Sequence, residues 1–418
     1  MIQDVISAGT LVTDTLTVTD DTIFWNFVAF NDGENNIDLE VERGLFVVDA
    51  ITQTGPSWAL GAAESLDVII EEGPNGDMAD VIEQMGSLET AEEISAATAQ
   101  LVPVLVAQSA QMVNLSLNLL TDATINRVAA RQGMAAGDEL MNGRNLWIRP
   151  FGSSGEQDDV GDVPGYDVDN HGLIIGYDQQ ISDSWLLGGA IGYSEAEVED
   201  NSSLLNHELD VDSMQLSLYA EWNITENVFM DFIGIAGSSD SESKRRIRFA
   251  DIDRTAEGSY DSWYGRVFAG LGRDFRYDKL TVTPIISAAY TTIDEDAYTE
   301  TNADSLNLAV DSNDLEALVL GLDGRVSYAL DEHGSSISAH VGVGYDTMTD
   351  NAVLSSTFVG GGPSFITTGS EPDELIVHAG IGVELHATDT VDIYLNYDYE
   401  DRSDFERMSM TATVRWAF

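Results

Sequence analysis

The larger, C-terminal part of the chain, residues 145–418, repeats one pattern of apolar and polar positions. Segments of about ten residues alternate between apolar and polar side chains, the period expected of a β-strand with two different faces. The alternation predicts twelve strands, beginning near NLWIRPF, HGLIIGYDQ, WLLGGAIGYS, MQLSLYAEW, VFMDFIGIA, WYGRVFAGLGRDF, LTVTPIISAAY, LEALVLGLDGRV, ISAHVGVGYD, ELIVHAGIGVEL, VDIYLNYDYE and MTATVRWAF.

The lengths of the connections indicate what kind of sheet these strands form. Short turns (ISDS, NITEN, YDK, LDEHG and HATDT) alternate with long polar loops around residues 152–168, 198–209, 238–260, 291–314 and 350–373. Bacterial outer-membrane barrels have an even number of strands, short periplasmic turns and longer outer loops. We therefore predict an all-β transmembrane barrel of about twelve antiparallel strands that begins and ends on the periplasmic side.

The last strand shows the expected two faces most clearly. An apolar face suited to lipid contains Met408, Met410, Ala412, Val414, Trp416 and Phe418, and the other face contains Ser409, Thr411, Thr413, Arg415 and Ala417. Aromatic residues near the strand ends predict two interfacial girdles. They are Trp147, Trp185, Trp222, Phe275 and Trp416 on the short-turn side, and Tyr193, Tyr290 and Tyr345 on the long-loop side.

A helical region precedes the strands, and its last helix, at about residues 103–133, is unusual in composition. The helix is rich in uncharged polar residues, whereas a helix exposed to lipid or on an acidic protein's surface would be apolar or rich in Glu. A narrow, polar, protein-lined channel suits it, and we expect it in the barrel lumen; a helix buried in a soluble bundle or at an oligomer contact is the alternative. Its predicted polar face comprises Gln108, Gln111, Asn114, Asn118, Arg127 and Arg131.

The first part of the chain alternates again, which predicts a small N-terminal β segment. We divide the chain into residues 1–56 (strands), 57–144 (helical linker) and 145–418 (barrel). The longest apolar stretch, LVPVLVA at residues 101–107, is far shorter than the roughly 18 residues of a membrane helix. The opening sequence MIQDVISAGTLVTDT has no secretion-signal pattern, so we expect any signal to have been removed.

The composition narrows the possible partners. There are 73 acidic and 18 basic residues, a formal net charge of −55, which argues against a nucleic-acid partner and favours a marine or halophilic source. Cysteine is absent. The acidic loops EQDDVGD, DEDAYTE and SEPDE lack the ligand spacing of a defined calcium loop, so we predict no metal site and no cofactor. We expect hydrated loops that divalent ions bridge loosely to lipopolysaccharide.

With these segments in place, residues 60–418 resemble the translocators of the autotransporter, or type V secretion, family. The resemblance lies in the Asn-containing linker helix, the first strand NLWIRPFG, the glycine-rich HGLIIGYDQQISDSWLLGGAIGYS and the ending TVRWAF. It implies an outer-membrane barrel that secretes and displays its own N-terminal passenger. The helix would then plug the pore with its N-terminal end outside. Residues 1–56 would be the last rungs of a β-helical passenger whose main body lies outside this chain.

The resemblance also implies roles for particular residues. The ending looks like an outer-membrane assembly signal, in which Val414, Trp416 and Phe418 would be recognised by the barrel-assembly machinery. Some passengers of the family are released when an Asn of the luminal helix attacks its own backbone, which makes Asn114 and Asn118 candidates. The paired-Asn signature of the protease-type members is missing, however, so plain luminal hydrogen bonding is the preferred interpretation.

Two other classes of function share the barrel. A diffusion porin predicts an open lumen and no dedicated helix. An outer-membrane hydrolase would use inward-facing His340 and His378 with the carboxylates of Asp346, Glu384, Asp392 and Asp398, but no nucleophile motif accompanies them. We therefore predict a monomeric, non-enzymatic translocator in the outer membrane of a Gram-negative bacterium, in contact with lipid and with its passenger end at the cell surface.

Overall fold

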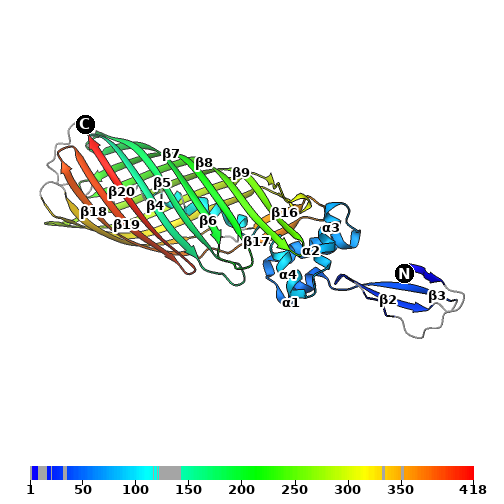
Figure 1. Cartoon of the computed structure of the whole chain (residues 1–418). Helices are drawn as coiled ribbons and strands as arrows, with labels where there is room; N and C mark the ends of the chain where they lie inside the picture. Colours follow the sequence, from blue (N-terminus) through cyan, green and yellow to red (C-terminus); the bar gives the residue numbers. More distant parts are fainter. Residues whose placement is uncertain are drawn as a thin grey trace.

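The computed structural model describes residues 2–7, 17–19, 21–31, 35–115, 117–119, 121, 143–331, 335–349 and 353–418. Three parts follow one another along the long axis of the molecule: a barrel, a helical module at one barrel end and a small sheet beyond it (Figure 1). The C-terminus lies at the opposite barrel end, beside the short turns.

The barrel is closed by twelve long antiparallel strands, and the β20–β4 pairing joins the last strand to the first. Each of the twelve predicted segments lies in one of them, so the predicted fold class is confirmed. The strands are β4 (Arg144–Gln157), β5 (Tyr166–Ser182), β6 (Trp185–Asp200), β7 (His207–Thr225), β8 (Val228–Phe249), β9 (Ile252–Arg273, continued by β10, Phe275–Tyr277), β11 (Leu280–Glu295), β14 (Asn313–Ala329), β15 (Ser336–Asp346), β18 (Leu375–Thr388), β19 (Val391–Arg402) and β20 (Phe405–Ala417).

One predicted loop is wrong. Residues 238–260 are not a long loop but the outer halves of β8 and β9, which pair without interruption up to Phe249 and Ile252. The period-two alternation continues through this polar stretch, with Arg245 and Ile247 buried and Arg246 and Arg248 exposed. The strands therefore project beyond the lipid-facing zone on the outer side.

Side chains alternate between lumen and exterior as the sequence predicted for β20. Met410 is 64% exposed and Thr413 is fully buried. Most members of the two predicted aromatic girdles are at least partly exposed on the outer face, and Trp185 stacks on Trp222 with ring centroids 5.6 Å apart. Trp147 contradicts its predicted girdle position because it points into the lumen, fully buried, and donates a 2.9 Å hydrogen bond to the hydroxyl of Tyr219.

The helical module contains α1 (Val47–Thr54), η1 (Ser57–Ala59), α2 (Leu60–Glu72), α3 (Asp77–Gly86) and α4 (Ala91–Ala99). Thr90 begins α4 with a reciprocal capping box to Glu93. Helix α1 lies within residues 1–56, where the sequence pattern predicted only strands. The cause is a tertiary cap: the Asp67 carboxylate accepts the backbone N–H groups of Val47 and Val48 at 3.0 Å each.

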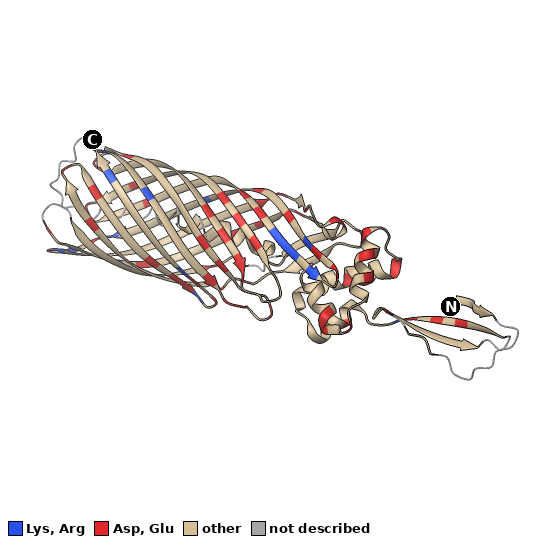
Figure 2. Ribbon diagram, viewed as in Figure 1, with Lys and Arg blue, Asp and Glu red and all other residues tan. Residues whose placement is uncertain are grey.

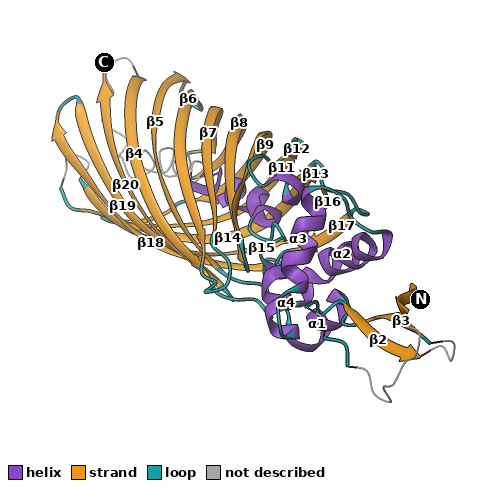
Figure 3. Cartoon of the chain, turned by 45° about the vertical axis from the view of Figure 1, so that its right-hand side comes forward, coloured by secondary structure: helices purple, strands orange, loops and turns teal. Residues whose placement is uncertain are grey.

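Two smaller sheets complete the fold. At the N-terminal end, β1 (Ile2–Ser7), β3 (Asn36–Arg43) and β2 (Trp25–Asn31) form an antiparallel sheet in that order. Two outer barrel loops form the second sheet, in the order β12 (Tyr298–Thr299), β13 (Leu308–Val310), β16 (Val353–Phe358) and β17 (Phe365–Thr368). Figure 3 shows α2 and α3 beside this loop sheet. Among the described residues, no helix has the length and apolar character needed to cross a membrane.

Candidate translocation pore and its luminal helix

The polypeptide enters the barrel from the helical module. After α4 it forms a short 3-10 turn, η2 (Val106–Gln108), and then a helix whose described residues are 109–115, 117–119 and 121. We call these residues the luminal helix. They correspond to the first part of the helix predicted at 103–133. Its remaining part, with Arg127 and Arg131, lies outside the described residues.

The outer end of the luminal helix is bound by the hydroxyl and the backbone oxygen of Ser370 and by one carboxylate. The amide oxygen of Gln108 accepts a 2.7 Å hydrogen bond from the Ser370 hydroxyl. Ser109 donates its hydroxyl to Glu295 at 2.7 Å, in a contact that is buried on both sides. The Gln111 amide reaches the carbonyl oxygen of Ser370 at 3.4 Å. These contacts tie the helix to the end of β11 and to the loop before β18.

Further into the barrel, arginines of the wall hold the helix. Arg266 of β9 donates to the Asn114 amide oxygen at 2.6 Å and to the Thr121 hydroxyl at 2.9 Å. Arg407 of β20 donates to the backbone oxygen of Leu115 at 3.3 Å. Charged donors on the wall thus meet neutral acceptors on the helix, which gives a physical reason for its uncharged polar composition. Sequence reasoning missed Arg266 because its partner lies far away along the chain.

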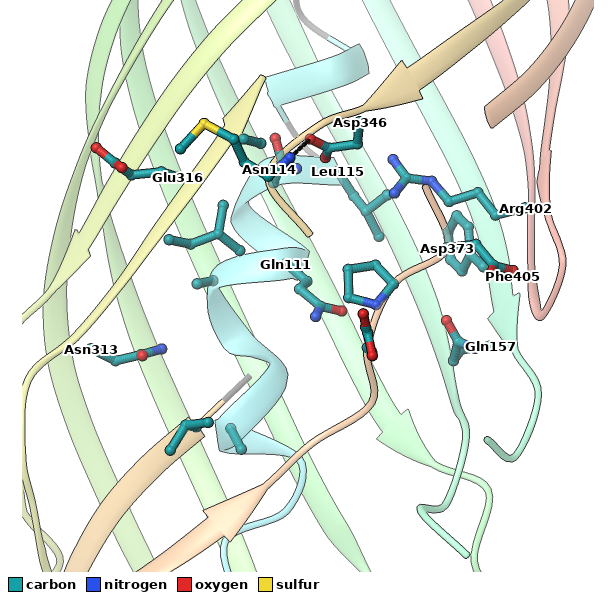
Figure 4. Close-up of a pocket in the computed structure, with 18 of the residues that line it drawn as sticks. Gln111, Asn114, Leu115, Gln157, Asn313, Glu316, Asp346, Asp373, Arg402 and Phe405 are labelled. Atoms are coloured by element: carbon teal, nitrogen blue, oxygen red, sulfur yellow. Dashed lines mark hydrogen bonds between the residues drawn. The ribbon is translucent and has the colours of Figure 1, made fainter. Parts of the chain in front are cut away.

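The helix does not fill the whole cross-section of the barrel. A cavity of about 340 Å³ separates its outer half from the ends of β14, β19 and β20. Figure 4 shows Gln111, Asn114 and Leu115 on the helix facing this space, with Asp346 and Arg402 among the wall residues. A second cavity, of about 180 Å³, lies deeper and is lined by both Asn114 and Asn118. The two cleavage candidates therefore border water-accessible space.

The structure brings three of the suggested hydrolase residues together, His340, His378 and Asp398, and places Asp346, Glu384 and Asp392 elsewhere. His378 and His340 neighbour each other, with ring centroids 6.0 Å apart, but each contacts a different carboxylate, Asp323 at 2.6 Å and Asp398 at 3.3 Å. Asp392 pairs with Arg415 and His386, Glu384 with Ser336, and Asp346 accepts from the backbone N–H of Leu318. No group of three or more His, Cys, Asp or Glu residues suited to a metal ion occurs in the part of the chain that the structure describes.

The residues of the suggested assembly signal share the outer face of β20. Trp416 is 39% exposed, Phe418 is 54% exposed and Val414 is half-buried. The Phe418 ring lies 6.4 Å from that of Tyr177 on β5, across the β20–β4 closure. These side chains would be accessible to lipid or to a protein that contacts the closing strand from outside.

The barrel is closed, has an even number of strands and an apolar exterior, and has short turns at one end. A helix of the same chain is bound inside it. These features define a class of outer-membrane protein in which the pore holds a segment of its own chain. The family model described as the autotransporter β-domain matches residues 146–398. The chain belongs to the autotransporter family. It is an outer-membrane translocator domain of the autotransporter type.

Individual relatives agree with this assignment. Outer membrane protein B of Rickettsia prowazekii is 22% identical, over 98% of this chain and 26% of its own length. Outer membrane protein A of Rickettsia conorii is 27% identical, over 58% of this chain and 13% of its own length. The chain thus spans about a quarter or less of these relatives. The translocator domain of the autotransporter NalP from Neisseria meningitidis shares the fold, with a TM-score of 0.58, 16% identity and coverage of 72% of this chain and 98% of that one.

Proposed function

We propose that residues 1–56 are the C-terminal end of the displayed passenger, that residues 57–144 link it to the barrel, and that the luminal helix plugs the pore once export is complete. The observation that carries this proposal is the set of contacts between the helix and the wall. Arg266 and Glu295 bind side chains of the helix from two neighbouring strands, and Arg407 binds its backbone from β20. Such bonds hold a helix in place, whereas a diffusion porin needs a free lumen.

The plug explains how one barrel can serve export and still leave a tight membrane. During export the hydrated lumen accommodates an extended polypeptide with its polar backbone groups solvated, as lipid does not permit. Afterwards the uncharged helix accepts hydrogen bonds from wall groups that would otherwise face water. For Asn114 we propose this bonding role rather than backbone cleavage, because its amide oxygen is already held by the Arg266 guanidinium.

Single-channel conductance in planar bilayers tests the plug. The intact chain is expected to show low conductance, and deletion of residues 57–143 is expected to produce a large, stable pore. Arg266→Ala removes two charge-assisted bonds to the helix, together about 3–6 kcal/mol, so brief openings should become more frequent. Arg273→Ala, on the exposed face of the same strand, is the matched control. Equal conductance of the intact and deleted chains would instead favour the porin.

We further propose the partners that an outer-membrane barrel of this charge requires. Val414, Trp416 and Phe418 are presented on the outer face of the last strand, where the barrel-assembly machinery would recognise them. Lipopolysaccharide is the proposed outer-leaflet neighbour, bridged to the acidic outer strands by divalent ions. The barrel acts as a monomer without catalytic activity of its own, and the excess of acidic residues suits a salt-rich environment.

A further inference from the structure

The outer loops of the barrel and the helical module meet in an interface that the plugging role does not require. Four separate parts of the barrel contribute to it: the β4–β5 loop, the β8–β9 hairpin, and the β11–β14 and β15–β18 loops that form the loop sheet. Figures 1 and 3 show the module at this end of the barrel. The contacts are specific in chemistry and largely buried.

The β8–β9 hairpin provides the ionic contacts. Asp77, the first residue of α3, receives two bonds from Arg254, at 2.8 and 2.6 Å, and one from the backbone N–H of Ser305 at 3.0 Å. Figure 2 shows the few basic residues of this hairpin beside the acidic helices. A bidentate arginine–carboxylate pair also fixes orientation, because both partners are planar.

A second, deeper contact involves Arg245. Its guanidinium pairs with Glu300 of the loop sheet at 2.6 Å, with both side chains almost fully buried. It also donates to the backbone oxygen of Gln100 at the end of α4, at 3.2 Å. The Gln100 amide oxygen in turn accepts the backbone N–H of Arg248 at 2.6 Å. The loops thus hold a buried charge pair whose remaining donor is satisfied by the module.

The other two loops contact α2 and the turn before it. The Trp58 indole donates to the backbone oxygen of Asp162 at 2.8 Å, and Ser65 donates to that of Pro363 at 2.9 Å. Gly61 of α2 lies so close to Ile366 of β17 that a Cβ there would stand 2.8 Å from the Ile366 carbonyl oxygen. Leu66 and Met78 of the module share one hydrophobic core with loop residues Leu306, Phe358 and Phe365.

We propose that the outer loops form a receptor for the helical module, residues 47–102, and hold it in one position on the barrel without help from the luminal helix. The base of the displayed passenger is then fixed by its own docking surface as well as by the covalent connection through the pore. None of the contacts named above involves residues 109–121, so the docking is separable from the plug.

Electron–electron distance measurements on spin-labelled full-length chain test this proposal, and the absence of native cysteine makes labelling specific. Labels at Glu71→Cys on α2 and Ser259→Cys on β9, both exposed sites, report the position of the module. A pair of labels on the barrel alone, Asp169→Cys with Ser259→Cys, gives the width of the distance distribution expected for two sites in fixed positions. The same pair verifies that the barrel has folded. We expect the distribution of module–barrel distances to be as narrow as the distribution measured within the barrel. A broad distribution of module–barrel distances would overturn the proposal.

The decisive variant replaces residues 109–121 by an equally long Gly/Ser segment. The distribution of module–barrel distances should stay narrow and centred at the same distance. If it broadens, the luminal helix and not the loops positions the module.

Gly61→Leu and Arg254→Gln, added to the chain with the Gly/Ser segment, should broaden this distribution, because both substitutions alter the interface itself. Arg246→Gln, on the exposed face of the same hairpin, should not. A distribution that stays narrow with the interface altered would show that another surface holds the module. Because no step depends on export, failure here leaves the translocator assignment untouched.

Discussion

Several glycines of the barrel wall lie directly beneath an aromatic ring from a neighbouring strand. A Cβ at Gly176 would collide with the indole of Trp147, and one at Gly188 would collide with the ring of Tyr219. These two rings are joined by the bond from the Trp147 indole to the Tyr219 hydroxyl. The small residues that the sequence shows in β5 and β6 are thus half of a packing arrangement whose other half comes from β4 and β7.

This packing predicts an unequal response to the same substitution. Gly176→Ala should destabilise the folded barrel by about 1–3 kcal/mol, because the added methyl group displaces the Trp147 ring. Gly234→Ala is the matched control, since nothing lies within 4 Å of a Cβ there. Urea unfolding followed by the heat-modifiable gel shift measures both variants. Equal stability of the two would refute the packing argument.

The Asp77–Arg254 pair predicts how the docking interface responds to pH. The hydrogen bonds from Arg254 hold the pKa of Asp77 well below its ordinary value of 3.8. A lowered carboxyl pKa stabilises the docked state above about pH 4, and this contribution is lost as the pH falls further and the carboxylate is protonated. The module–barrel distance distribution should therefore broaden only as the pH is lowered well below about 4. In Asp77→Asn that pH response should be absent; an unaltered response would assign it to other groups.

Predictions for single residues are correct where the position in the strand alone decides which way a side chain points. They fail where a partner far away along the chain decides it. The two faces of β20 follow from alternation, so Met410 and Thr413 were placed correctly. Trp147 was placed outside because aromatic residues near strand ends usually face lipid, yet its ring is held in the lumen by Gly176 and Tyr219. The Arg266–Asn114 bond joins residues 152 positions apart, and no local pattern reveals such a pair.

At the scale of strands, the outer parts of β5 to β8 carry carboxylates in register. Asp169 faces Glu197, Glu197 faces Asp210, and Asp210 faces Glu242 on successive strands. Like charges directly opposite one another destabilise a sheet. Figure 2 shows this acidic zone on the strands between the lipid-facing surface and the helical module. The strand extensions therefore depend on screening by the surrounding ions.

Backbone hydrogen exchange in the outer parts of β5 to β8, here called the outer rungs of the barrel, tests that dependence on screening. Raising the salt concentration from about 0.1 M to about 1 M shortens the screening length from about 10 Å to about 3 Å. Backbone exchange near Glu197 and Asp210 should become slower, while the apolar rungs near Leu187 and Leu218 should not change. Glu197→Gln combined with Asp210→Asn should remove most of the salt effect. Outer rungs that exchange equally at both concentrations would contradict the argument.

The element scale also shows where sequence periodicity stops being informative. All twelve strands follow from alternation and turn length, but the sequence predicts a loop for the outer parts of β8 and β9 because polar residues predominate there. The sequence predicts a strand where helix α1 forms, because the N-terminal cap of this helix, Asp67, lies in another helix. Both misassignments occur outside the lipid-facing zone, where water removes the strict contrast between the two faces.

At the scale of the whole molecule, the order of the parts gives the direction of export. The C-terminus lies beside the short turns, and the N-terminal sheet lies beyond the outer loops and the helical module (Figure 1). The chain must therefore cross the barrel once between the module and β4. This follows from topology and does not depend on the activity of any passenger.

The central claim is that the N-terminal end reaches the cell surface through or beside its own barrel. A tag at residue 1, on intact cells that express the chain behind a secretion signal, tests it through access of antibody and protease. We predict that the tag is accessible on intact cells while the barrel stays protected. A tag that becomes accessible only after the outer membrane is opened would contradict export and would leave a barrel with a periplasmic N-terminal domain.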